Sequence, residues 1–74
     1  MAEKHSPRVL DSLALAYSLN GEPGKAAAVE RRAIEELGDA DPGLRAELEK
    51  KLERYEKAAD DAGIEIEDAD DVLG

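Results

Sequence analysis

Apolar residues recur at helical spacing in three stretches of the 74-residue chain, each bracketed by residues that start and stop helices. The first stretch runs from about Pro7 to Leu19. Ser6 precedes it as an N-cap, and Pro7 suits the first helical position, where no N–H is needed. Leu15 and Leu19 fall partly off the main stripe and leave apolar material on a second face. The side expected to be buried holds Val9, Leu10, Leu13, Ala16 and Tyr17.

Two further helices are predicted by the same signals. Asn20-Gly21 ends the first helix, Pro23 opens a second that reaches about Leu37, and Gly38 is its expected C-cap. Asp41-Pro42 repeats the start signal, so that a third helix runs from about Pro42 to Ala62 before Gly63. Its apolar residues average 3.6 positions apart, which is typical of a straight α-helix: Leu44, Leu48, Leu52, Tyr55, Ala59 and Ala62.

The pattern therefore predicts an all-α fold in which one three-helix domain, residues 6–63, lies between two short ends. Residues 1–5 are polar and expected to be disordered. Residues 64–74 carry dense acidic charge and few large apolar groups, so most of this tail is also expected to be disordered. The alternative is an acidic-apolar tail that orders on a partner or folds back into a groove of its own chain.

The first two helices carry a motif with fixed offsets. It reads Leu10-x-x-Leu13-Ala14-x-x-Tyr17-x-x-x-Gly21-x-x-x-x-Ala26 and continues to Ala33. This motif resembles one tetratricopeptide repeat, a pair of antiparallel helices with small residues where the helices approach closely. Leu44 and Leu48 follow Leu10 and Ala14 by the family's 34-residue period. The resemblance implies that the third helix caps the hairpin.

Five positions depart from patterns of the family. Glu30 stands where the family generally has a large apolar residue, Pro23 replaces a usual tyrosine, and Lys51 falls where the next repeat would have its tyrosine. One subset of the family clamps a C-terminal carboxylate with Lys and Asn, and the matching positions here are Asp11 and Leu15. The resemblance therefore implies no carboxylate clamp in this chain.

The net charge of −9 belongs mostly to the tail. Residues 1–59 hold twelve acidic and ten basic groups, whereas residues 60–74 hold seven acidic groups and no basic one. Such a body offers no basic stripe for a phosphate backbone, so nucleic-acid binding is not expected. Neither a signal peptide nor a run of about 18 apolar residues is recognisable. A soluble, cytoplasmic protein without a membrane partner is the expectation.

No pairing of groups suited to catalysis or metal binding is recognisable, so neither an enzyme, a cofactor nor a metal is expected. The chain has no cysteine, and its one histidine, His5, has no obvious second ligand. Tyr17 and Tyr55 lie on apolar stripes and are expected in the core. Charged pairs four residues apart on one helix, such as Glu47 with Lys51, indicate solvated faces. The same holds for Arg31 and Arg32 with Glu35 and Glu36.

The leading functional hypothesis is a non-catalytic interaction module that binds a protein or peptide, or a copy of itself. A single repeat cannot cover both sides of its hairpin, so a second apolar surface is expected to form a two-fold homodimer. The alternative is a structural C-terminal appendage of a larger, for example thioredoxin-like, protein, as the resemblance implies. The predicted interaction surface comprises Leu15, Leu19, Ala27 and Ile34.

Overall fold

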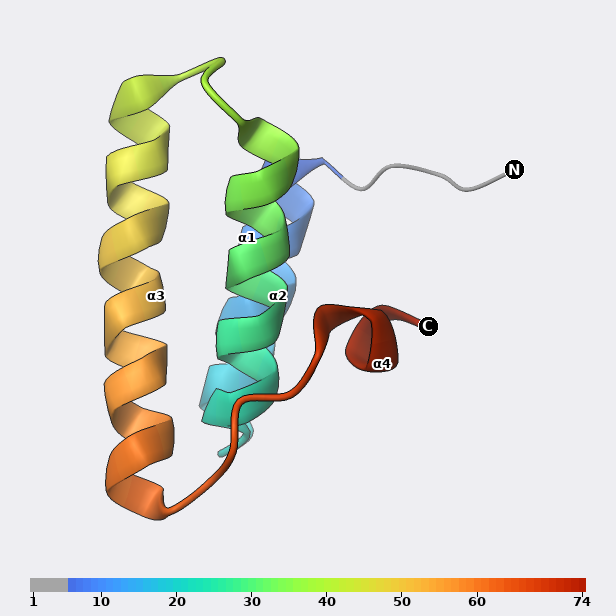
Figure 1. Ribbon diagram of the computed structural model, residues 1–74, viewed down its shortest axis with the longest axis vertical. Coiled ribbons are helices and arrows are strands. Elements are labelled where there is room, and N and C mark those ends of the chain that lie inside the picture. The colour runs from blue at the N-terminus through green and yellow to red at the C-terminus, as the bar shows by residue number, and fades with distance from the viewer. Residues whose placement is uncertain (1–5) are drawn as a thin grey trace.

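The computed structural model describes residues 6–74, and its helices are joined by short turns (Figure 1). Helix α1 spans Pro7–Leu19, α2 spans Pro23–Leu37 and α3 spans Pro42–Ala62. These bounds confirm the three predicted helices and the all-α class, and no strand occurs between residues 6 and 74. A fourth helix, α4, covers Ala69–Leu73. The predicted disorder of residues 1–5, and with it His5, lies outside the described residues.

Local capping fixes where the long helices begin and end. The Ser6 hydroxyl accepts from the Arg8 amide at 3.3 Å, and the Asp41 carboxylate accepts from the Leu44 amide at 3.1 Å. Gly63 adopts a left-handed conformation with φ +69°, which lets the Ile64 amide donate to the Ala59 carbonyl at 2.8 Å. These three boundaries are thus made by bonds within a few residues of the sequence.

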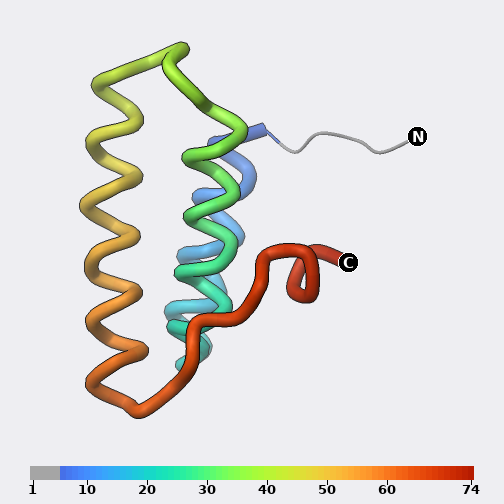
Figure 2. The backbone as a smooth tube through the Cα atoms, in the orientation of Figure 1, coloured from blue at the N-terminus to red at the C-terminus, as the bar shows by residue number. Residues whose placement is uncertain are grey.

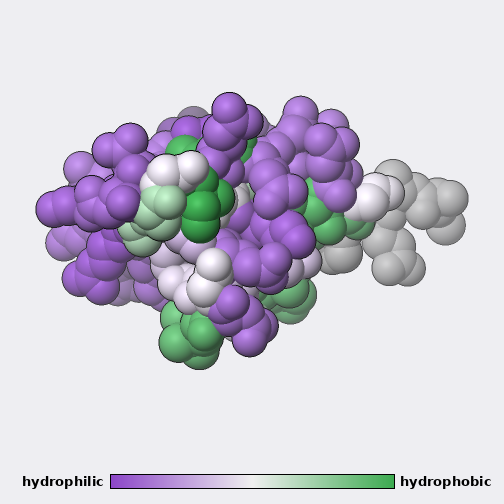
Figure 3. Space-filling view, turned by 90° about the horizontal axis from the view of Figure 1, so that it is seen from below, coloured by the Kyte–Doolittle hydropathy of each residue, from purple (hydrophilic) through white to green (hydrophobic). Residues whose placement is uncertain are grey.

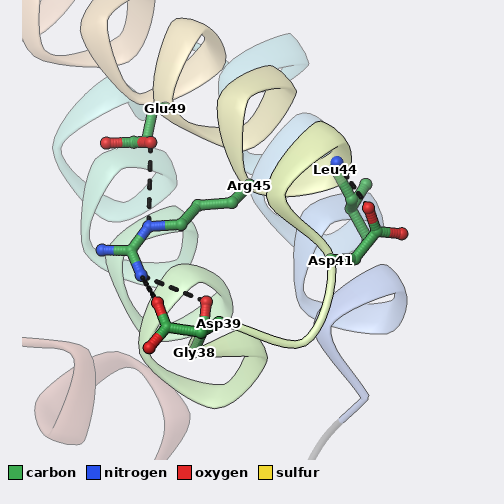
Figure 4. A network of polar contacts seen from close by, with 6 residues as sticks. All are labelled: Gly38, Asp39, Asp41, Leu44, Arg45 and Glu49. Atoms are coloured by element: carbon green, nitrogen blue, oxygen red, sulfur yellow. Dashed lines mark hydrogen bonds and ion pairs between the residues drawn. The ribbon is translucent and has the colours of Figure 1, made fainter.

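The corner between α2 and α3 is tied by one arginine (Figure 4). The Arg45 guanidinium, on the first turns of α3, donates to the Gly38 carbonyl at 3.1 Å and to the Asp39 carboxylate at 3.3 Å. It also lies 3.7 Å from Glu49. A cation thereby satisfies a carbonyl at the C-terminal end of α2, where the helix dipole favours positive charge.

Helix α2 lies at the centre of the molecule. Helix α1 runs antiparallel to it behind, α3 lies on one side and α4 on the other (Figures 1 and 2). All five consecutive residues from Ala26 to Glu30 are buried, which only a helix covered on several sides achieves. The core is built from α1, α2 and α3 and contains Leu10, Ala14, Ala26, Ala27, Val29, Ala33, Leu48 and Tyr55.

Residues 64–74, predicted to be mostly disordered, lie folded back along α2 in the structure. The segment leaves α3, crosses α2 and ends in α4 (Figure 1), so the fold-back alternative describes it. Ile66, Val72 and Leu73 pack against the core, and the Asp68 carboxylate caps α4 by accepting from the Asp70 amide at 3.0 Å. The few apolar residues of the tail suffice to hold it against α2, because α1 and α3 leave that side of α2 uncovered.

Candidate interaction surface and buried carboxylate cluster

The motif residues of the hairpin lie at its helix–helix contacts. Leu10, Ala14, Ala26 and Ala33 are buried, while Leu13 and Tyr17 are partly buried and pack against the same core. Gly21 occupies the turn with φ +75°, a conformation that favours glycine. The structure therefore brings the seven motif residues to one hairpin. Tyr55 is buried in the core as well.

The four residues of the predicted interaction surface do not share one exposed face. Leu15 and Leu19 are 50% and 78% exposed, but Ala27 is fully buried and Ile34 packs against the core. The reason is the enclosure of α2, because Ala27 belongs to the core that α1, α2 and α3 build and Ile34 packs against that core. Only the part of this surface that belongs to α1 remains accessible.

The outward face of α1 is apolar and almost without charge. Val9, 58% exposed, and Ala16, also exposed, were expected on the buried side but join Leu15 and Leu19. Steps of three or four residues lead from Val9 through the exposed Ser12 to Leu15 and Ala16 and on to Leu19, which places these residues on one side of the helix. On the face of the molecule seen in Figure 3, apolar groups form small spots among hydrophilic ones. We call Val9, Ser12, Leu15, Ala16 and Leu19 the α1 face.

A buried acid lies on the opposite side of this helix. Glu30 of α2 is fully buried, and neither of its carboxylate oxygens has a hydrogen-bond partner. Burial raises its pKa to about 8, and the nearby Asp11 carboxylate of α1 adds to this increase. Because two ionised carboxylates only accept, a proton on Glu30 is needed to turn their contact into a hydrogen bond. Glu30 is therefore neutral in the folded chain near pH 7.

Charged and phenolic groups of α3 complete this cluster. The Lys51 ammonium donates to both Asp11 oxygens, at 3.2 and 2.9 Å, and so joins α3 to α1. The sequence predicted a pair between Lys51 and Glu47, but the partner of Lys51 is Asp11. The contact with Asp11 raises the pKa of Lys51, and burial raises the pKa of Tyr55. Asp11 thus faces a cation on one side and a protonated acid on the other.

Sequence comparison adds no functional assignment to this geometry. No family model, curated protein or solved structure matches the chain. The function must therefore be inferred from the surfaces of the molecule.

Two observations bear on which chemistry the molecule supports. No group of three or more His, Cys, Asp or Glu side chains able to hold a metal ion occurs among residues 6–74. In the same part of the chain no helix is long and apolar enough to cross a membrane.

Sequence reasoning identified the members of the buried cluster but not their proximity. Glu30 and Lys51 stood out as departures from a family pattern, and Asp11 as the position that removes a clamp. The available signal was that Glu30 and Lys51 put charge at two positions where the family pattern has large side chains. Their meeting depends on how α1, α2 and α3 are rotated against one another, which the periodicity does not specify.

Proposed function

We propose that this chain is a non-catalytic protein–protein interaction module of the tetratricopeptide type that binds a second copy of itself through the α1 face. The observation that carries the proposal is the exposure of Val9, Leu15 and Leu19, at 58%, 50% and 78%, on one helix side. Arg8 is the one charged residue beside them on the exposed side of α1. Burial of the hairpin motif residues supports the tetratricopeptide assignment.

The α1 face suits a two-fold contact of modest strength. A 13-residue helix is about 20 Å long, whereas a standard interface buries roughly 800 Å² per partner. That standard area is about a sixth of the 4969 Å² surface of this chain. One side of a single short helix is a small part of that surface, so α1 packed against its copy forms only a small interface. An isologous contact between two copies closes on itself and does not propagate. We expect a dimer with an affinity in the micromolar range.

Light scattering coupled to size exclusion tests the proposal. The parent chain at about 100 µM should elute with a dimer mass, because this concentration lies well above a micromolar dissociation constant. Leu15→Lys with Leu19→Lys should restore the monomer, since two like charges would face their copies across the axis. The matched control, Ala46→Lys with Ala58→Lys, adds the same charge to exposed positions of α3 and should leave the dimer intact. A parent that stays monomeric at about 100 µM would refute self-association.

A further inference from the structure

The side of α2 that faces the tail is built for close approach of a peptide backbone. A side chain at Gly24 would overlap the Glu65 carbonyl oxygen and lie 3.0 Å from Ile64 Cγ2. The Glu67 amide donates to the Gly24 carbonyl at 3.4 Å. An extended segment, residues 64–67, therefore lies directly against the first turn of α2, where glycine leaves room for it.

Charge complementarity extends along this contact. The Arg32 guanidinium donates to the Asp70 carboxylate. The Lys25 ammonium pairs with Glu22, which raises the pKa of Lys25, and the Glu67 carboxylate of the tail adds to this increase. Residues 64–74 carry five acidic groups and no basic one. The chemistry that α2 recognises here is therefore an acidic segment with apolar residues at intervals.

The tail covers this side of α2 without filling it. A cleft of about 500 Å³ remains between α2 and the tail, and the tail's own ion-pairing group, Asp70, is 77% exposed. Such a volume lies within the range of small-ligand sites. The cleft is lined by Ala28, Arg31, Arg32 and Glu35 of α2 and by residues 66–70 of the tail. The ion pair between the tail and α2 is largely solvated and contributes little to holding the tail, which makes the tail a replaceable occupant.

We propose that the side of α2 bearing Gly24, Ala28 and Arg32 is a second binding surface, which accepts an acidic peptide with interspersed apolar residues. Residues 64–74 occupy it within the chain and compete with such a peptide supplied by another protein. This surface lies on α2 and does not depend on the α1 face. Binding of a peptide from another protein then requires release of the tail. The apparent affinity for that peptide equals the intrinsic affinity multiplied by the fraction of molecules in which the tail is released.

Fluorescence anisotropy with a labelled peptide of the sequence 64–74 tests the proposal on the full-length chain. Ile66→Ser with Asp70→Lys removes an apolar anchor and the partner of Arg32, and so frees the surface. We expect the peptide to bind this variant at least tenfold more tightly than the parent, since a tethered competitor acts at roughly millimolar effective concentration. The proposal would be overturned if the peptide bound the parent and the variant equally, or bound neither, while circular dichroism showed that the variant keeps its helices.

Matched variants then locate the bound peptide. Adding Gly24→Ala to the freed chain should abolish binding, whereas adding Gly43→Ala should not. Gly43 also follows a helix-opening proline, but a side chain there would meet only Asp41 Oδ1 at 3.5 Å. A scrambled peptide of equal composition that binds as well would overturn the proposal in favour of unspecific charge attraction.

A second measurement, on the parent chain, tests the proposal even if the variant with Ile66→Ser and Asp70→Lys unfolds. In the isotope-labelled parent, excess unlabelled peptide should shift the amide resonances of residues 64–74 toward those of a released tail. Unchanged tail resonances at millimolar peptide would refute exchange between the two occupants.

Discussion

The buried Glu30 predicts that the folded chain loses stability as the pH rises. In the unfolded chain this carboxyl ionises near its ordinary pKa of 4.5, whereas in the folded chain burial and Asp11 raise the pKa to about 8. Between these values the folded state holds one proton more than the unfolded state. The free energy of unfolding contributed by this group is therefore complete below about pH 4.5 and is lost as the pH rises towards 8.

Replacing Glu30 with glutamine isolates this contribution. Glutamine has nearly the same shape as the protonated acid but cannot ionise in the unfolded chain. At about 1.4 kcal/mol per pKa unit, the 2.5 pH units between 4.5 and 7 correspond to roughly 3 kcal/mol. We therefore expect Glu30→Gln to match the parent near pH 4.5 and to be more stable by about that amount at pH 7. For a domain of this size the gain equals more than ten degrees in Tm.

Urea unfolding followed by circular dichroism at several pH values measures the effect. The informative quantity is the difference between variant and parent, because the remaining carboxyl groups titrate alike in both chains. Glu53→Gln is the matched control, since it removes the same charge from an exposed position and should leave this difference near zero. A difference that stays flat between pH 5 and 8, or a variant less stable than the parent at pH 7, would refute the neutral buried acid.

Three further predictions concern the helix contacts. Asp11→Asn frees the Lys51 ammonium to pair with the buried acid, so the pH at which stability is lost should shift downward in the same unfolding series; an unchanged midpoint would contradict the cluster. Gly24→Ala should release the tail and speed amide exchange in residues 64–74, because the added methyl group would overlap the Glu65 carbonyl oxygen. Gly43→Ala should have no such effect, because no backbone lies against Gly43. Ala26→Leu should overpack a fully buried site and lower stability by roughly 1–3 kcal/mol; an unaltered melting curve would show that the repeat register is wrong.

The sequence determined the helices because their signals are local. Ser6, Asp41 and Gly63 cap helix ends through bonds that reach only a few residues along the chain, and the apolar spacing follows from 3.6 residues per turn. Burial of Leu10 and Ala26 also followed from the pattern, because both lie on the apolar side of a helix that must pack against a near neighbour.

Tertiary structure alone decided which surfaces stay open and which charges meet. Ala27 is buried and the tail lies folded back because α2 receives α1, α3 and residues 64–74 on different sides, and no local signal gives that arrangement. Gly24 and Gly43 each follow a proline that opens a helix, so the sequence does not distinguish them, yet only Gly24 lies against the backbone of another segment. Asp11 meets Lys51 across 40 residues, and such a contact depends on the relative rotation and height of two helices, which periodicity along either one leaves undetermined.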